Sequence, residues 1–264
     1  MKVHTPLDLP TLKTSCFGRT GRFYSVVDST NQRLLEWAVE GAPHGASVLA
    51  AEQTAGRGRQ GRSWQSEAGC GLFGSLLLRP ERSLAGSAAF SLVTALAVAD
   101  TLNRTSDVEC AVKWPNDLTV DGKKLAGILL EARGGQQPFF VVGLGLNLKP
   151  PASGWAPQLD QRAISLAEIS SRLREAHTIW AEILNRLERM WERFRVQGFG
   201  AFTDEWHARD TLRGQRVRVQ SGDSHFHCQV EGVDSEGRLR VRLSDASVLR
   251  LEAGEVHLHR EGEE

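Results

Sequence analysis

The sequence predicts an α/β (α+β) protein whose mixed, largely antiparallel sheet is covered by helices and followed by a small β-barrel. Apolar runs of strand length alternate with helical patterns over residues 22–210. The Asp121–Gly122 turn signal joins two apolar runs as an antiparallel hairpin. Residues 211–264 change to short alternating strands with glycine turns, which is typical of a small barrel.

Each element follows from a local pattern, taken in chain order. Residues 1–21 show little pattern and are expected to form a lead-in segment. Asp28, Ser29 and Thr30 supply capping side chains for a helix that is expected to close near Gly41. Apolar positions three and four apart predict an amphipathic helix at 179–194. The other expected elements are a buried helix at 87–103, strands at 22–27, 46–53, 71–80, 109–115 and 138–148, and a hairpin at 117–133.

Composition excludes several classes of protein. The chain has 264 residues and no net formal charge, whereas a general nucleic-acid binder is usually basic. No apolar run reaches the roughly 18 residues that a membrane span needs, and the opening residues lack the pattern of a signal peptide. The four cysteines are widely spaced and form no C-x-x-C pair, which favours free thiols and a cytoplasmic location.

The segment "GRGRQGRSW", residues 56–64, combines cationic side chains with a flexible backbone. It does not open into a helix, so it does not predict a dinucleotide-binding turn, and it lacks the lysine of a P-loop. Binding of single-stranded RNA is an alternative, although one short segment in a neutral protein is little for it. A loop that closes over a carboxylate or phosphate suits its arginines and glycines. Trp64 offers a flat face for a base, or else a side chain for the core.

Five motifs in order carry a resemblance to a known family. They are "DSTN", "EQTAGRGRQGRSW", "KWPNDL", "GKKLAGILLE" and "VGLGLNL". Together they closely resemble biotin protein ligase, also called biotin–[acetyl-CoA-carboxylase] ligase. The motifs span about residues 25–150, and the later helix and barrel extend the resemblance to nearly the whole chain.

The resemblance implies a catalytic domain like those of class II synthetases at 22–210 and an SH3-like barrel at 211–264. It implies that biotin and ATP are substrates, that Mg²⁺ assists, and that the product is biotinyl-5'-AMP. Biotin then passes to one lysine of a biotin carboxyl carrier protein or domain of acetyl-CoA carboxylase or a related carboxylase. Cations stabilise the charge that builds up at the α-phosphate, and a closing loop protects the adenylate from water.

The resemblance also assigns roles to particular residues. Lys124, Arg59 and Asp117 are the expected catalytic residues, with Asp117 also a candidate Mg²⁺ ligand. The expected biotin-binding residues are Ser29, Thr30, Asn31, Gln53, Arg57, Gly58, Arg59, Lys124 and Gly127. The expected residues for ATP and the adenylate are Arg57, Arg59, Arg62, Trp64, Asn116, Lys124 and Asn147.

Structural interpretations stand beside these roles. Ser29 or Thr30 can be a plain N-cap as well as a pocket residue. The Asn116–Asp117 pair after proline is often only a turn, and Asn147 can simply end a strand. Lys123 must point to the strand face opposite Lys124, so it is expected in solvent.

Two other functions remain open at this stage. One is lipoate–protein ligation, which uses the same chemistry on a longer acid. The other is a non-catalytic regulator that senses biotin or a nucleotide. About 21 residues precede the first strand, too few for a helix-turn-helix domain, so we expect the short, ligase-only form without specific DNA binding. The resemblance allows a homodimer, and no membrane partner is expected.

Overall fold

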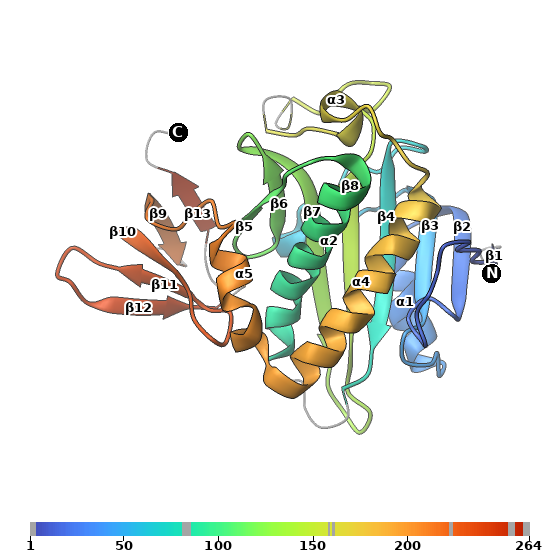
Figure 1. Ribbon diagram of the computed structural model, residues 1–264, viewed down its shortest axis with the longest axis horizontal. Coiled ribbons are helices and arrows are strands. Elements are labelled where there is room, and N and C mark those ends of the chain that lie inside the picture. Colours follow the sequence, from blue (N-terminus) through green and yellow to red (C-terminus); the bar gives the residue numbers. More distant parts are fainter. Residues whose placement is uncertain are drawn as a thin grey trace.

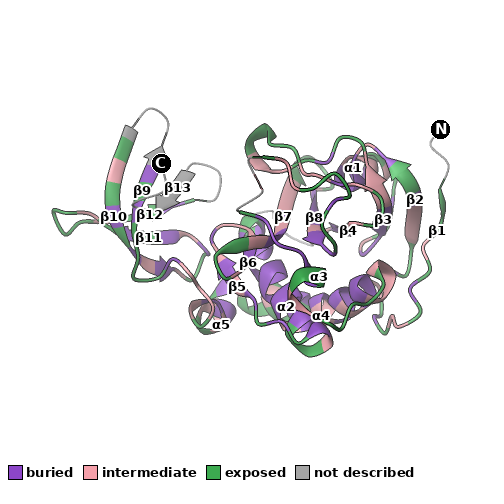
Figure 2. Ribbon diagram, turned by 90° about the horizontal axis from the view of Figure 1, so that it is seen from above, coloured by how far each residue is buried: buried purple, intermediate pink, exposed green. Residues whose placement is uncertain are grey.

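A computed structural model describes residues 4–80, 86–157, 159, 162–221, 224–252 and 257–260 of this protein. A large sheet carries helices on both faces, and a smaller sheet lies at the C-terminal end of the chain (Figures 1 and 2). The strand order of the large sheet is β1-β2-β3-β4-β8-β7-β6-β5. Its strands are β1 (Thr5–Pro6), β2 (Gly21–Val27), β3 (Ser47–Gln53), β4 (Gly71–Leu78), β5 (Ala111–Lys113), β6 (Asp117–Val120), β7 (Lys123–Arg133) and β8 (Phe139–Asn147).

The described strand pairs of this sheet are antiparallel except for β2 with β3, which is parallel. The prediction of a mixed, largely antiparallel sheet is therefore confirmed. The β6–β7 hairpin turns at Asp121 and Gly122, whose φ angles are 51° and 78°. Two positive φ angles characterise the tight turn that the sequence predicts.

Helices cover the two faces of the large sheet unequally. They are α1 (Thr30–Val39), α2 (Phe90–Ser106), α3 (Leu166–Ile169), α4 (Ala176–Gln197) and α5 (Thr203–His207), with 3₁₀ turns η1 (Arg59–Gly61), η2 (Ser87–Ala89) and η3 (Phe199–Phe202). Figure 2 shows α2 and α4 on one face of the sheet and α1 on the other. Most of α2 is buried because it packs against α4 as well as against β7. No helix among the described residues is long and apolar enough to cross a membrane.

The core extends to both sides of the sheet. A large cluster of buried side chains lies between the sheet, α2 and α4, and a smaller one lies under α1. Trp180 of α4 is fully buried, and its Nε1 donates to Ser47 Oγ at 2.9 Å. A Cβ on Gly74 would come within 3.0 Å of this indole, so the glycine lets the helix approach the sheet closely.

The smaller sheet is antiparallel, in the order β12-β11-β10-β9-β13. Its strands are β9 (Arg216–Ser221), β10 (Ser224–Val233), β11 (Leu239–Arg242), β12 (Val248–Leu251) and β13 (His257–Arg260). Alternate side chains such as Val217 and Val219 are buried, which explains the alternating sequence pattern. Trp114 Nε1 donates to the Gly237 carbonyl at 3.0 Å and ties this sheet to the large one. The arrangement is consistent with the expected SH3-like unit.

Several elements differ from the sequence pattern. The segment at 4–20, expected to be a featureless lead-in, adds the two-residue strand β1 and is fastened to α4. The Glu188 carboxylate accepts from the backbone N–H groups of residues 15, 16 and 17, and Asn185 accepts from that of Lys13. The strand expected at 109–115 is only three residues long, and the short helices α3 and α5 were not expected.

Candidate active site

The segment at 56–64 forms a compact hairpin-like loop. Gly58 N–H donates to the Arg62 carbonyl at 2.7 Å, and Trp64 N–H donates to the Gly56 carbonyl at 2.9 Å. Gln60 and Gly61 at the tip have φ angles of 56° and 74°. The strand β4 follows the loop, so the glycines do not open into a helix and the rejection of a dinucleotide fingerprint is confirmed.

Lys124 and Asp117 meet on neighbouring strands of the hairpin. The Lys124 Nζ lies 2.7 Å from Asp117 Oδ1, as an ion pair without hydrogen-bond geometry. The register of β6 against β7 shifts between Leu118 and Thr119. This bulge brings Lys124 onto the face of Asp117, because one extra residue reverses the alternation of side chains. Lys123 is exposed, as the sequence predicts.

The Trp64 ring lies across β7 and β8 beside Lys124. A Cβ on Gly145 would lie 2.5 Å from the ring, and one on Gly127 would lie 3.0 Å from it. These glycines therefore create the shelf on which the indole rests. Lys124 Nζ stands 5.3 Å from the ring centroid, within the range of a cation–π contact. The indole Nε1 is buried without a hydrogen-bond partner in the described structure.

Arg59 extends from the loop toward the turn that precedes β6. Its Nη1 donates to Asn116 Oδ1 at 3.4 Å, and Asn116 Nδ2 donates to the Ile128 carbonyl at 2.7 Å. Burial lowers the pKa of the Arg59 guanidinium, although the nearby Asp117 carboxylate raises it and Arg62 lowers it further. A partly desolvated cation attracts an anion more strongly than one in bulk water.

A second polar group lines the start of α1. The buried Ser29 caps this helix by accepting from Gln32 N–H at 3.5 Å. The backbone N–H of Thr30 donates to Gln53 Oε1 at 2.8 Å. Asn31 packs against Gly143, where a Cβ would come within 2.2 Å of its amide oxygen. These groups supply both donors and acceptors beside the loop.

The structure brings most of the expected residues into two groups. One contains Lys124, Asp117, Trp64 and Arg59, and the other is the polar group at the start of α1. Arg57 joins the polar group through Glu131 Oε2, at 3.3 Å from its Nη2. Arg62 is exposed, and its backbone closes the loop. Asn147 donates from Nδ2 to the carbonyls of Lys124 and Ile164, so much of its side chain serves to hold the strand end.

Sequence reasoning missed several residues at this site. Ser75 is fully buried in the apolar strand β4, with its hydroxyl 2.6 Å from Asn31 Oδ1. Ser66 Oγ accepts from Gln53 Nε2 at 3.1 Å. Glu131 accepts from Asn31 Nδ2 at 2.8 Å. The sequence offered two weak indications of these residues. Ser75 is a polar residue among apolar neighbours, and Glu131 is an acidic residue near the end of an apolar strand.

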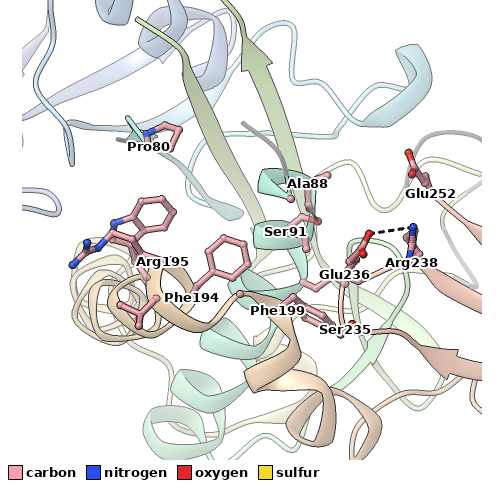
Figure 3. Close-up of a pocket in the computed structure, with 17 residues that line it drawn as sticks. Pro80, Ala88, Ser91, Phe194, Arg195, Phe199, Ser235, Glu236, Arg238 and Glu252 are labelled. Carbon is pink, nitrogen blue, oxygen red and sulfur yellow. Dashed lines mark hydrogen bonds and ion pairs between the residues drawn. The ribbon is translucent and has the colours of Figure 1, made fainter. Parts of the chain in front are cut away.

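Two hollows are found near these elements. The larger, of about 830 Å³, lies between α2, α4 and the turn at 234–237, and none of the expected site residues lines it (Figure 3). The smaller, of about 70 Å³, is lined by Arg59 and Asn116 together with Ala88 and Ser91. Arg59 and Asn116 line the smaller hollow, and Asn116 directly precedes Asp117, the ion-pair partner of Lys124, so we place the candidate active site beside this hollow.

This combination of fold and polar site defines a class of protein. The model of the biotin/lipoate A/B protein ligase family matches residues 23–147. The biotin–[acetyl-CoA-carboxylase] ligase of Mycobacterium tuberculosis is 33% identical over 97% of this chain and 98% of its own length. The corresponding ligase of Paracoccus denitrificans is 36% identical over 81% of this chain and 91% of its own.

A solved structure agrees with these relatives. Biotin protein ligase from Aquifex aeolicus, in complex with biotin and ATP, superposes with a TM-score of 0.79 at 27% identity. The match covers 92% of this chain and 99% of that structure. The chain belongs to the biotin protein ligase family.

Proposed function

We propose that this chain joins biotin to ATP and then transfers biotin to a lysine of a carrier domain. The observation that carries the proposal is the meeting of Lys124 with Asp117 and Trp64, with Arg59 close to Asp117. The ligases from Mycobacterium tuberculosis and Paracoccus denitrificans and the Aquifex structure with biotin and ATP support it.

In the first step a biotin carboxylate oxygen attacks the α-phosphorus of ATP. The new oxygen–phosphorus bond gives biotinyl-5'-adenylate, and pyrophosphate leaves with the bonding electron pair. Lys124 is proposed to hold both anions against their repulsion, and Arg59 to stabilise charge on the phosphate. Trp64 supplies the aromatic face for adenine. Thr30, Asn31 and Gln53 match the N–H donors and carbonyl acceptor of the ureido ring.

In the second step the neutral amine of the carrier lysine attacks the acyl carbon of the adenylate. The amide bond forms, AMP leaves with the electron pair of the broken carbon–oxygen bond, and the amine loses one proton. The loop at 56–64 is proposed to shield the adenylate from water until the amine arrives.

Mg²⁺ is proposed as a companion of ATP, and the available donors fit it. Asp117 offers a carboxylate and Asn116 an amide oxygen at the nucleotide side. No cluster of three or more metal-binding side chains occurs in the described ranges. Mg²⁺ is commonly held by one or two carboxylates together with substrate phosphates and water, where it neutralises phosphate charge.

The proposed partner is the biotin carboxyl carrier domain of acetyl-CoA carboxylase or a related carboxylase. The similarity to the biotin–[acetyl-CoA-carboxylase] ligases of Mycobacterium tuberculosis and Paracoccus denitrificans supports this choice of substrate. We propose a cytoplasmic location, with which the four free cysteines agree. The proposal is compatible with a homodimer.

Pyrophosphate release tests the first step directly. The protein is mixed with ATP, Mg²⁺ and biotin, or with lipoic acid in place of biotin. We expect release with biotin and little with lipoic acid. Release with lipoic acid alone would favour lipoate ligation, and binding of biotin without release would favour a non-catalytic sensor.

A further inference from the structure

The buried Asn31 amide is held on both sides within the polar group at the start of α1. Its Nδ2 donates to Glu131 Oε2 at 2.8 Å and to the Leu129 carbonyl at 3.2 Å. Its Oδ1 lies 2.6 Å from the hydroxyl of Ser75. Both amide hydrogens therefore have acceptors, and the amide oxygen has a donor.

Two acceptors on one side determine which way this amide points. The Leu129 carbonyl and the Glu131 carboxylate only accept hydrogen bonds, so the NH₂ group of Asn31 faces them and the oxygen faces Ser75. A glutamine at 131 would keep an acceptor for Asn31 but would remove the charge that strengthens this hydrogen bond. The same change would remove the negative partner of Arg57.

Hydrogen bonds of the neighbouring residue reach the far end of the loop. Thr30, next to Asn31 in the chain, donates to Gln53 Oε1 from its backbone N–H at 2.8 Å and from Oγ1 at 3.1 Å. Gln53 Nε2 donates to Ser66 Oγ at 3.1 Å, and Ser66 donates to the Trp64 carbonyl at 3.1 Å. The polar group at the start of α1 is thus connected to the residue that ends the loop.

Glu131 also contacts the near end of the loop. The Oε2 atom that accepts from Asn31 lies 3.3 Å from Arg57 Nη2. The Arg57 side chain is 41% exposed, so this ion pair adds little to stability. Its effect is expected in ligand binding, where the position of Arg57 matters.

We infer that Glu131 is a positioning residue that couples the biotin pocket to the loop. This inference rests on the proposed function and adds to it a residue that acts through its neighbours. Through one oxygen, Glu131 holds the Asn31 amide, together with the Leu129 carbonyl, and also holds the Arg57 guanidinium. The ureido ring of biotin, with N–H donors and a carbonyl acceptor, is the substrate group that depends on such fixed polarity.

The first test replaces Glu131 by glutamine and measures biotin Kd by calorimetry, the KM of ATP and Tm. The matched control is Glu231→Gln, which removes a carboxylate that pairs with Arg240 and Arg242 in the smaller sheet. We expect biotin to bind tenfold to a hundredfold more weakly in Glu131→Gln, the scale of a hydrogen bond to a charged group. The KM of ATP should change less than the Kd of biotin, Tm should stay near the wild-type value, and the control should match wild type throughout.

The second test restores the hydrogen bond with its direction reversed. Asn31→Asp places two carboxylates together and should weaken biotin strongly. Adding Glu131→Gln should recover part of that affinity, because the glutamine NH₂ can donate to the new carboxylate. If Glu131 has only a structural role, the double variant should bind biotin more weakly than Asn31→Asp alone.

The inference fails if Glu131→Gln binds biotin as wild type does, if biotin and ATP weaken equally, or if the double variant shows no recovery. Absence of biotin binding by wild type would also overturn it. If Glu131→Gln does not fold, Glu131→Asp takes its place. The aspartate side chain is one methylene shorter, so its carboxylate lies farther from Asn31 and Arg57, and biotin should still bind more weakly. Wild type that binds biotin without releasing pyrophosphate overturns the proposed function alone, because calorimetry still decides the role of Glu131.

Discussion

Replacing Lys124 by alanine should remove most of the adenylate-forming activity while leaving the fold intact. The side chain is 35% exposed and pairs with Asp117 at 2.7 Å, so solvent screens the pair. Its contribution to stability is about 1 kcal/mol or less. Loss of one donor aimed at developing charge lowers a rate about 10²–10³-fold, or about 2.7–4 kcal/mol. The effect on activity therefore exceeds the effect on stability.

The assay is the initial rate of pyrophosphate release at saturating biotin and ATP, with Tm measured for each variant. Lys123→Ala is the matched control, because Lys123 is the adjacent residue, carries the same charge and is exposed. It should stay within about twofold of wild type, the scale of a surface substitution. Lys124→Arg should not restore the rate, because a planar fork does not replace a compact ammonium. Equal losses at both lysines would refute the assignment.

Three further predictions concern other parts of the molecule. Trp64→Ala should weaken ATP about tenfold to a hundredfold and biotin much less, since a stacked base contributes roughly 1–3 kcal/mol; nucleotide titration measures this. Arg59→Gly removes a charge-assisted contact of roughly 1.5–3 kcal/mol, so adenylate should form, escape sooner and label bystander proteins on a streptavidin blot. Glu188→Gln should reduce stability at pH 7 by about 1–2 kcal/mol after allowance for solvent, and by less in acid, as urea unfolding would show.

The sign of the acid effect follows from the pKa of Glu188. Burial raises this pKa, but hydrogen bonds from three backbone N–H groups outweigh burial and lower it below its ordinary value. A carboxylate with a lowered folded pKa stabilises the protein above its unfolded pKa. That stabilisation is lost as pH falls through the folded pKa. A difference between wild type and Glu188→Gln that grows in acid would contradict this account.

Distinct results would contradict the other two predictions. Equal weakening of ATP and biotin by Trp64→Ala, or unfolding of that variant, would make Trp64 a core residue instead of an adenine shelf. An Arg59→Gly enzyme that retains its adenylate as long as wild type and labels only the carrier would show that the loop is not a gate.

Local patterns predicted much of the fold because the forces that form these elements are local. The hydroxyl of Ser29 caps its own helix, and the positive φ angles at Asp121 and Gly122 suit the residues that occupy them. The three-four spacing of apolar residues likewise gave α4, which extends three residues beyond the predicted helix at each end. Most of the residues expected at the site lie close together because their motifs occur at neighbouring strand ends.

Other features depend on contacts between distant segments. Glu188 and Asn185 hold a segment that lies about 170 residues earlier in the chain, and no local pattern records such a partner. The bulge in β7 that brings Lys124 to Asp117 depends on strand register, which hydrophobic alternation does not fix at one residue. The helix α3 has four residues and is too short to show a periodic pattern. Its Ser165–Glu168 capping box is the one local sequence feature that indicates its start.

The most direct test of the proposed ligase activity is the intact mass of a biotin carboxyl carrier domain. The domain is incubated with this protein, ATP, Mg²⁺ and an equimolar mixture of biotin and lipoic acid, and the modified residue is located by peptide mapping. The account predicts a gain of one biotin on one lysine, and no gain when ATP is omitted. A lipoyl gain, or an unmodified carrier in a mixture where pyrophosphate is released, would contradict it.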